Sequence, residues 1–493
     1  MEDFDRLLRR YARDPWLQRA FLAFTVGMFL SCSAKMAGAQ TLDRTVRPTP
    51  GPAKAARLPR IQMRELPNGI RIAVLEDHEI PAVSVSALVQ IPSLLEPVGK
   101  EGVASFTSAM LREGTTAHTA EALLETFADL GNSVAPTGFY TITRNVDRSL
   151  ELMAEQLLTP SFPQPSLDRI KANTTTNLRR QREQPGYIAS RIFSAVVYGP
   201  GHPYTRTTTE ASVGAIARDD LVAFHDRYYR PQNTSFVVAG DITPDEAVAK
   251  LQRVFGAWQR TGDRAVAQVT PPAGPKQTAI YLYDRPGSPQ SHVVVGHLGP
   301  RRDVPDYFAL ALANTAFGGA FNSRLNLNLR EKHGFTYGAS SGFSYRRVPE
   351  VGVFTAGASV HTAKTDSALA EIVAELRALR GARPLTSEEL AFAKSGITKG
   401  IPLAFETVPQ IAGGAATILS DNLPLDYYDT IVTKVEAVSI QDAVAAAQRH
   451  IDPDRMAIVI VGDRAGIERA LTAASLAPIV IVDENGAPVS GAR

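Results

Sequence analysis

The sequence predicts an α+β fold made of two homologous α/β sandwich lobes, each a mixed or antiparallel sheet packed with helices. Strand and helix patterns are interspersed without a strict βαβα rhythm, which disfavours a doubly wound parallel sheet. The same order of patterns occurs twice, at an offset of about 210 to 222 residues, too long for the period of a solenoid. The sequence therefore indicates the duplication of a whole domain.

Each half contains the same succession of strand candidates. A turn signal at Leu66–Gly69 precedes two apolar runs, and each half ends on an apolar strand that runs into a Gly-Asp turn. The strands expected in the first half are residues 70–75, 82–90 and 235–241, and their counterparts in the second half are 279–283, 292–296 and 457–463. One apolar helix face also recurs, formed by Leu150, Met153 and Leu157 in the first half and by Leu369, Ile372, Leu376 and Leu379 in the second.

The N-terminus is expected to be an export signal. An apolar run of about 15 residues, 20–34, follows four arginines and precedes Ala37-Gly38-Ala39, an A-x-A cleavage pattern. A membrane-spanning helix needs about 20 apolar residues, so we expect a secretory signal peptide and an exported, periplasmic protein. A lipoprotein is the alternative, because Cys32 could carry a lipid, and only then would the chain be anchored to a membrane.

Composition sets the remaining boundaries. Residues 41–59 are rich in Pro, Thr and Ala without periodicity, and Pro271–Pro275 lies in a stretch suited to joining two rigid lobes. We therefore divide the chain into a signal peptide (1–39), a linker (40–60), an N-terminal lobe (61–262), an interlobe linker (263–277), a C-terminal lobe (278–476) and a tail (477–493).

Charge and cysteine content exclude several classes of function. The 52 Lys and Arg against 50 Asp and Glu leave a formal net charge of +2, which does not favour a nucleic-acid partner. Because Cys32 is the single cysteine, this chain alone provides no disulfide, Fe–S cluster, cysteine-rich zinc site or Cys/His protease site. His292 and His297 are five residues apart in a strand pattern and so point to opposite faces, and the other histidines stand singly.

The segment that follows residue 317 predicts a helix and then a strand. Ser323 or Asn322 is expected to cap the helix, Gly334 to end it in the left-handed conformation, and a strand to start at Phe335. Residues 338–342 fit the G-x-S-x-G pattern of a hydrolase, but that pattern requires a turn between a strand and a helix, and the residues that follow look like more strand.

Arg330 and Tyr337 would then lie on either side of one tight corner. A guanidinium with fixed donors beside a phenol hydroxyl can hold a carbonyl or carboxylate group of an extended peptide. The residues alone leave a second interpretation open, because an Arg in a salt bridge beside a packed Tyr is the commoner arrangement.

This segment and the duplicated halves resemble the pitrilysin/insulinase family of zinc metallopeptidases, especially its short processing-peptidase-like members. The resemblance covers residues 60 to 475, and further matches are Leu66–Gly69, Gly201–Tyr204 and Asp220–Pro231. It implies two lobes that form half of a clamshell. It also implies that Arg330 and Tyr337 are the pair that holds substrate near the scissile bond.

The family's catalytic motif is an inverted zinc signature, His-x-x-Glu-His, on a helix of the first lobe. Two histidines four residues apart share a helix face and bind zinc, while the Glu activates the bound water. In this chain the motif positions are occupied by Ser105, Ser108 and Ala109. The third ligand, a downstream Glu, falls near Asn177, where there is no acid. The resemblance therefore implies a degenerate zinc site and no metal on this chain.

These features lead us to expect a non-catalytic, substrate-binding subunit of a heteromeric zinc metallopeptidase, inactive alone. Zinc is expected on a homologous partner subunit, whose active site Arg330 and Tyr337 would reach. The expected substrate is an unfolded peptide, bound extended along a sheet edge by main-chain hydrogen bonds. Two alternatives are a peptide-binding or structural homologue without a proteolytic role and a lone peptidase with an atypical metal site.

Overall fold

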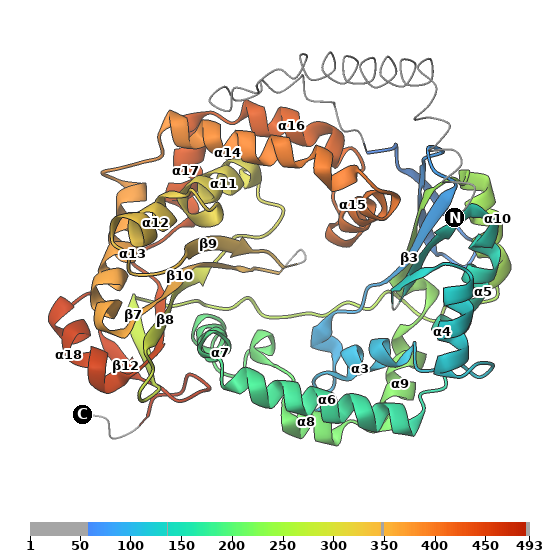
Figure 1. Cartoon of the computed structure of the whole chain (residues 1–493), viewed down its shortest axis with the longest axis horizontal. Coiled ribbons are helices and arrows are strands. Elements are labelled where there is room, and N and C mark those ends of the chain that lie inside the picture. The colour runs from blue at the N-terminus through green and yellow to red at the C-terminus, as the bar shows by residue number, and fades with distance from the viewer. Residues whose placement is uncertain (1–57, 136, 347–349, 490–493) are drawn as a thin grey trace, which may run out of the picture. The chain divides into compact units, whose positions relative to one another are not determined.

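The computed structural model of the chain describes residues 58–489, apart from 136 and 347–349 (Figure 1). The expected signal peptide 1–39, with Cys32, and the expected linker up to residue 57 lie outside the described residues. Within the described part of the chain, no helix combines the length and the apolar character needed to cross a membrane.

The N-terminal sheet has six strands in the order β1-β2-β6-β3-β5-β4. Strands β2 and β6 run parallel, and every other neighbouring pair is antiparallel. The strands are β1 (Gln62–Glu65), β2 (Arg71–Glu76), β3 (Ala82–Val89), β4 (Ser133–Ala135), β5 (Gly138–Ile142) and β6 (Thr234–Gly240).

The C-terminal sheet has the order β12-β7-β11-β8-β10-β9 and repeats this arrangement. Strand β7 is parallel to β11, as β2 is to β6, and the three strands beyond β11 are antiparallel to their neighbours. The strands are β7 (Ala279–Asp284), β8 (Gln290–Leu298), β9 (Ala339–Ser344), β10 (Val353–His361), β11 (Ala457–Gly462) and β12 (Ile479–Ile481). The predicted fold class, two sheets of mixed direction packed with helices, is confirmed.

The two sheets differ at one edge. In the N-terminal sheet the strand beside β2 is β1, which precedes it, whereas in the C-terminal sheet the strand beside β7 is β12, from the end of the chain. The expectation of a linker-like tail after residue 477 is therefore wrong for Ile479–Ile481, which pair in parallel with β7. The reason is physical: the apolar run that these residues form extends the sheet and places Val482 in a buried position.

Helices of each half cover one face of that half's sheet. Apolar residues at helical spacing face the core, as predicted for Leu150, Met153 and Leu157 on α5. A helix start signal is also in place: Thr243 and Glu246 form a capping box at α10 (Pro244–Phe255), whose first residue is Pro244.

The helices of the first half are α3 (Val103–Met110), α4 (Ala120–Asp129), α5 (Val146–Leu158), α6 (Gln164–Arg182), α7 (Pro185–Tyr198), α8 (Glu210–Ala215), α9 (Arg218–Tyr228) and α10 (Pro244–Phe255). Those of the second half are α11 (Tyr307–Asn314), α12 (Arg324–Asn326), α13 (Thr365–Arg380), α14 (Ser387–Gly400), α15 (Val408–Asp421), α16 (Tyr427–Ala437), α17 (Ile440–His450) and α18 (Arg464–Ala474).

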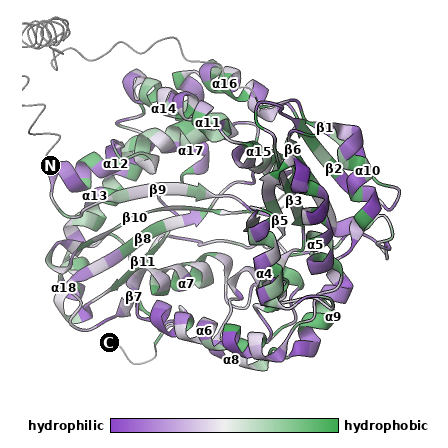
Figure 2. Cartoon of the chain, turned by 45° about the vertical axis from the view of Figure 1, so that its right-hand side comes forward, coloured by the Kyte–Doolittle hydropathy of each residue, from purple (hydrophilic) through white to green (hydrophobic). Residues whose placement is uncertain are grey.

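The second face of each sheet is covered by a helix from the other half. Helix α7 packs Ile192 and Phe193 against Val459 of β11, and α15 packs Ile411 and Ala415 against the N-terminal sheet. The central strands β6 and β11 are consequently buried on both faces, which explains why β11 is apolar throughout and β6 is apolar after Ser235. Figure 2 shows the hydrophobic colour on β3 and β6 and more polar colour on the peripheral helix α10.

Candidate functional site

The degenerate zinc motif lies on α3, on the side that the core does not use. Ser105 is exposed, and Ser108 and Ala109 are half-buried. The opposite side of α3 is buried in the N-terminal core, and its residues are Val103, Phe106, Thr107 and Met110. The three motif positions thus share one helix face, as ligands at this spacing would, but their hydroxyl and methyl groups cannot hold zinc.

The surroundings of these positions supply no substitute ligand. The Ser108 hydroxyl hydrogen-bonds Tyr229, and burial raises the pKa of that tyrosine to about 12, so its phenol stays protonated at neutral pH. Asn177 lies on α6, is exposed, and accepts a hydrogen bond from Arg180 one turn along the helix. Among the described residues, these contacts bring neither a thiolate nor a carboxylate to the missing ligand positions.

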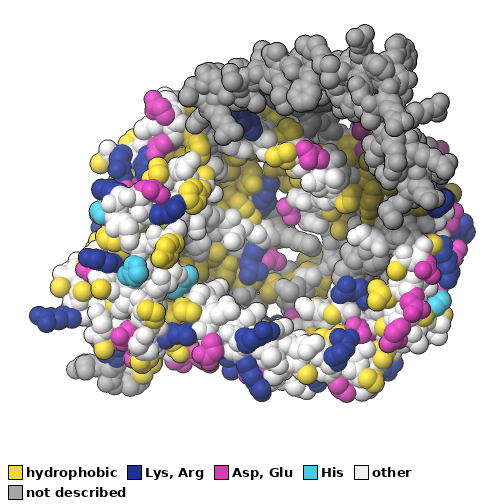
Figure 3. Space-filling view, viewed as in Figure 1, with side chains coloured by type: hydrophobic (Ala, Val, Ile, Leu, Met, Phe, Trp, Pro, Cys, Tyr) yellow, Lys and Arg dark blue, Asp and Glu magenta, His cyan; other side chains and the backbone are white. Residues whose placement is uncertain are grey.

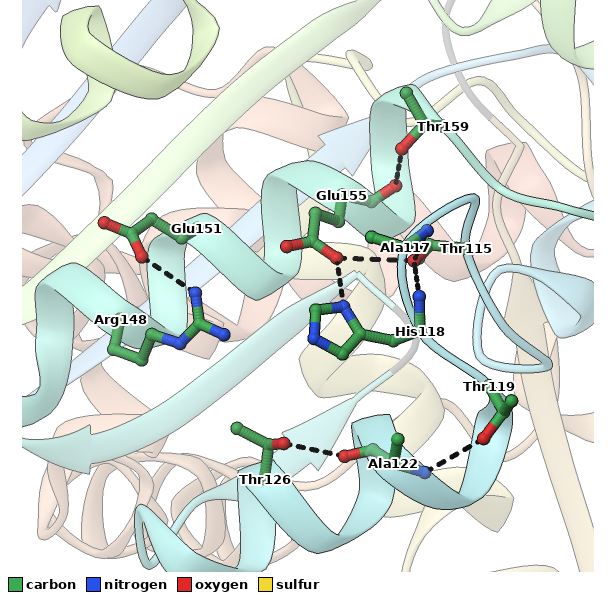
Figure 4. A network of polar contacts seen from close by, with 10 residues as sticks. All are labelled: Thr115, Ala117, His118, Thr119, Ala122, Thr126, Arg148, Glu151, Glu155 and Thr159. Carbon is green, nitrogen blue, oxygen red and sulfur yellow. Dashed lines mark hydrogen bonds and ion pairs between the residues drawn. The ribbon is translucent and has the colours of Figure 1, made fainter.

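Histidines elsewhere serve as structural partners. His118 Nδ1 lies 2.7 Å from Glu155 Oε2, and the Thr115 hydroxyl donates to the same oxygen at 3.3 Å (Figure 4). These bonds fasten the loop after α3 to α5. Throughout the described ranges, no three His, Cys, Asp or Glu side chains are arranged to hold a metal ion. The lone peptidase with an atypical metal site therefore gains no support from the geometry.

The helix predicted before the Arg330 corner is present but irregular. Ser323 is its N-cap residue as expected, although the serine hydroxyl makes no capping bond and is buried without a hydrogen-bond partner. Helix α12 continues as a π-helix, η6 (Leu327–Lys332), and Gly334 ends it with φ +63° in the predicted left-handed conformation. A π-helical turn of this kind is frequent at functional sites.

The strand predicted to start at Phe335 begins only at Ala339. The hydroxyl of Thr336 donates to the Ser359 carbonyl at 2.7 Å and accepts the N–H of Gly338 at 3.1 Å. The backbone of residues 335–338 makes one bond to β10, from the His361 N–H to the Phe335 carbonyl at 3.3 Å, and Thr336 bonds β10 through its side chain instead. The predicted start of the strand was therefore wrong by four residues. The same strand contains the G-x-S-x-G match, which confirms that no nucleophile elbow is present.

Arg330 and Tyr337 are both accessible, but no hydrogen bond joins them in the described structure. The guanidinium of Arg330 lies over the ring of Phe321, with Cζ 4.6 Å from the ring centroid, and Nη1 is 3.4 Å from a carboxylate oxygen of Glu331. The geometry of this ion pair does not make a hydrogen bond, so Nη1 remains a buried donor without an acceptor. Tyr337 is 84% exposed. Arg330 thus has one unpaired guanidinium donor that is buried, whereas the phenol of Tyr337 is available to a ligand.

A groove of about 610 Å³ lies beside Tyr337 on the C-terminal sheet. Its floor is formed by small side chains that alternate along β9 and β10, and they are Ser340, Gly342, Thr355, Gly357 and Ser359. His292 of β8 also lines it, with Nδ1 2.9 Å from Ser359 Oγ. Burial lowers the pKa of His292, and among the described residues that line the groove there is no Asp, Glu, Lys or Arg, so this lining is uncharged at neutral pH.

Strand β9 is the last strand of its sheet and has a strand neighbour on one side only among the described residues. Such an edge can present unpaired backbone N–H and C=O groups, to which an extended peptide can add as a further strand. On β9 two of these groups are already bound, because the Ala339 N–H donates to Asn326 Oδ1 at 2.9 Å and the Ser341 carbonyl accepts from Asn314 Nδ2 at 3.3 Å. Sequence reasoning placed Tyr337 here but missed the groove. The signal was present as alternating small residues in 339–344 and 353–361, yet it becomes meaningful only once the register of β9 on β10 is known.

The visible outer surface carries basic and acidic side chains that are interspersed, without a large field of one sign (Figure 3). This distribution agrees with the near-zero net charge. It gives no indication of a polyanion-binding face on that side.

Comparisons with known proteins agree with this geometry. A family model described as the peptidase M16 inactive domain matches residues 215–397. A relative in Mycobacterium leprae, named an uncharacterized zinc protease, is 26% identical and aligns over 72% of this chain and 81% of its own length. A Bacillus subtilis relative named in the same way is 22% identical, over 78% of this chain and 95% of its own.

Solved structures show the same fold. The crystal structure of a peptidase M16 inactive domain from Pseudomonas fluorescens has a TM-score of 0.74 and 27% identity, covering 82% of this chain and 97% of that one. The first half of the periplasmic protease PqqL from Escherichia coli has a TM-score of 0.66 at 16% identity, covering 85% and 97%.

Fold and site together define a two-lobe, peptidase-like protein in which the residues at the zinc-motif positions have no metal-ligating side chains. The resemblance to the pitrilysin/insulinase family is thereby confirmed, and this chain, which lacks the zinc motif, is similar to peptidase M16 proteins in sequence and in fold.

Proposed function

We propose that this chain is the non-catalytic, peptide-binding subunit of a heteromeric zinc metallopeptidase and supplies Arg330 and Tyr337 to a zinc-bearing paralogue. The observation that carries the proposal is the exposed Tyr337 beside an uncharged groove at an open sheet edge. A protein that had lost every peptidase role would have no need of a large phenol in water at this place. The groove matches an unfolded peptide held by its main chain, with loose sequence preference.

The chemistry would be divided between two chains. The paralogue would supply the metal-activated water, which nothing at Ser105, Ser108 or Ala109 can provide. In this chain the edge of β9, at the backbone groups that Asn314 and Asn326 do not bond, would bind and orient the peptide backbone. Arg330 and Tyr337 would donate hydrogen bonds to the scissile carbonyl, whose oxygen gains negative charge as the bond is attacked.

Export is part of the same proposal. The apolar run and the A-x-A pattern within residues 1–39 support a complex that works in the periplasm, with lipidation at Cys32 as the alternative route. Unfolded peptides are a suitable substrate for a subunit with an uncharged groove.

A second candidate is a peptide-binding or structural homologue without any proteolytic role. The match to a model named as an inactive domain favours it. It shares the groove with the first proposal but requires no zinc-bearing partner. The two differ in what happens when a paralogue with His-x-x-Glu-His is present.

The experiment is to purify the mature chain alone, the paralogue alone and the two co-expressed, then measure zinc by mass spectrometry and turnover of an internally quenched peptide. We expect no zinc and no turnover with this chain alone, and one zinc per pair with turnover well above that of the paralogue alone. Stoichiometric zinc on the isolated chain would overturn the proposal. Equal turnover with and without this chain would favour the structural homologue.

A further inference from the structure

The segment Gly201–Arg206, which carries the Gly-His-Pro-Tyr match, binds three separate elements through alternate side chains. It follows α7 and contains the short 3-10 helix η3 (Pro203–Thr205). His202 holds the interlobe connection, Tyr204 holds the hairpin of β9 and β10, and Arg206 holds the start of α3. This segment has no part in the site described above.

His202 is fixed in one orientation. Its Nδ1 accepts the backbone N–H of Tyr204 at 3.1 Å, and since a backbone N–H can only donate, the ring proton is on Nε2. Nε2 then donates to the carbonyl of Thr270 at 2.9 Å, in the segment between the two lobes. This hydrogen bond ties the turn after α7 to the connection between the two lobes.

Tyr204 and Tyr198 form a cage around Arg346, which lies in the connection between β9 and β10. The guanidinium carbon is 4.0 Å from the centroid of Tyr204 and 5.3 Å from that of Tyr198, and both tyrosines are buried. Arg346 Nη1 lies 3.7 Å from Glu350, on the other side of the same connection. Burial and Glu350 raise the pKa of Tyr204 to about 12, so the phenol stays protonated and its ring remains neutral. The Arg346 side chain is 33% exposed, so its guanidinium is partly desolvated where it lies against the two aromatic rings and makes cation–π contacts.

Arg206 extends the same segment to the helix that carries the degenerate zinc positions. Its Nε donates to Glu101 at 3.0 Å, and Nη2 donates to the carbonyl of Glu96 at 2.7 Å. The carboxylate of Glu96 in turn accepts the backbone N–H groups of Gly102 and Ala104, at the start of α3. The segment Gly201–Arg206 therefore contacts the start of α3, the interlobe connection and the β9–β10 hairpin.

We infer that Tyr198, Tyr204, Arg346 and Glu350, here named the Arg346 latch, position the β9–β10 hairpin and thereby set the affinity of the groove for peptide. Strand β9 pairs with β10 on one side, and on the other side Asn314 and Asn326 bond its backbone at Ser341 and Ala339. The latch adds an anchor at the connection between β9 and β10, which it reaches from α7 and the turn after it. Tyr204 and Arg346 are positioning residues in this role. The affinity part rests on the proposed function; the placement of the hairpin does not.

The test compares the full mature chain with Arg346→Ala, Arg346→Lys and Tyr204→Phe. Arg301→Ala is the matched control, because Arg301 is an exposed arginine of the same half that pairs with Asp303. Amide hydrogen exchange of residues 339–344 reports on β9, and a fluorescein-labelled, unstructured peptide reports on the groove. We expect Arg346→Ala to speed exchange in β9 about tenfold and to weaken peptide binding about three- to thirtyfold. Arg346→Lys, which keeps the cation, and Tyr204→Phe, which keeps the ring, should have exchange rates in β9 and peptide affinities close to those of wild type. Arg301→Ala should change neither the exchange rate nor the affinity.

Two results would overturn the latch: exchange in β9 that is unchanged by Arg346→Ala, or an Arg346→Lys variant as impaired as Arg346→Ala. Faster exchange in Arg346→Ala, recovered by Arg346→Lys, together with no peptide bound to any form, including wild type, would uphold the latch and reject the proposed function. If Arg346→Ala leaves both the exchange in β9 and peptide binding unchanged, the latch is rejected and the peptide-binding role of the proposed function is upheld.

Discussion

The guanidinium of Arg330 rests on the ring of Phe321, with Cζ 4.6 Å from the ring centroid. Both residues lie in the segment around η6, and Phe321 is 67% exposed, so the ring gains little from burial in the core. The aromatic ring instead gives Arg330 a platform that limits its conformations. A pre-oriented guanidinium loses less entropy when it binds a peptide carbonyl.

Removing this platform should weaken peptide binding without unfolding the protein. We expect Phe321→Ala to raise the Kd for an unstructured labelled peptide about two- to fivefold, the loss that corresponds to an exposed cation–π contact. Phe392→Ala, at another exposed phenylalanine of the same half, is the control and should leave the Kd unchanged. Equal effects of the two variants in fluorescence anisotropy would show that Phe321 has no particular relation to Arg330.

The groove can be filled without disturbing its walls. Gly342 lines it, and a Cβ at this position would meet no atom within 4 Å. We expect Gly342→Leu to weaken peptide binding tenfold or more while the midpoint of urea unfolding stays at its wild-type value. Gly396→Leu, at an equally open glycine on α14, is the matched control. Full peptide affinity in Gly342→Leu would mean that peptides bind elsewhere.

Stability should fall as the pH drops below neutrality, partly because of His297. Burial lowers the pKa of this side chain, whose Nδ1 lies 2.7 Å from the Leu298 carbonyl while Nε2 accepts the N–H of Asp452 at 3.0 Å. The unfolded chain takes up a proton with the ordinary pKa of 6.5, and the folded chain does not. The free energy of unfolding therefore decreases as the pH falls below 6.5, until the lower pKa of the folded state is reached.

Urea unfolding between pH 5 and pH 7.5 measures this dependence. Relative to wild type, His297→Asn should be less stable at pH 7.5 and should lose less further stability on acidification. His225 and His292 are shifted in the same direction and will maintain part of the slope. Identical slopes in wild type and His297→Asn would show that His297 takes up its proton equally in both states.

Four substitutions should return a metal site to α3 and α6. Ser105→His, Ser108→Glu, Ala109→His and Asn177→Glu together restore the ligand types at positions that α3 presents on one free face. We expect about one zinc per chain in the quadruple variant by plasma mass spectrometry, whereas a variant with Ser105→His and Ser108→Glu alone should bind none. Failure of the quadruple variant to bind zinc would mean that the register assigned to the motif is wrong.

Local patterns were enough to predict the strands that build each sheet. The apolar runs in β6, after Ser235, and in β11 follow directly from burial on two faces, and the partial alternation of β3 follows from burial on one. The sequence could not predict that α7 packs on the sheet of the second half and α15 on the sheet of the first, because an apolar helix face does not reveal which sheet it covers. Strand β12 escaped notice because three apolar residues in a Pro- and Gly-containing tail carry no period.

The candidate site divides in the same way. Ser105, Ser108 and Ala109 were located by the residues around them, and the structure places all three on one helix face. The left-handed Gly334 was predicted from its position after a helix. The π-helical turn before it and the cage around Arg346 depend on tertiary packing, which overrides local propensity and leaves no regular signal in sequence.

The most direct test of the central claim is the turnover of a quenched peptide by the proposed complex, in which this chain carries Arg330→Ala or Tyr337→Phe and is co-purified with a zinc-bearing paralogue. We predict that both variants co-purify in wild-type amounts and with wild-type zinc content, while turnover falls at least tenfold, since hydrogen bonds to the developing oxyanion are lost. Wild-type turnover in both variant complexes would contradict the claim that this chain contributes to the active site.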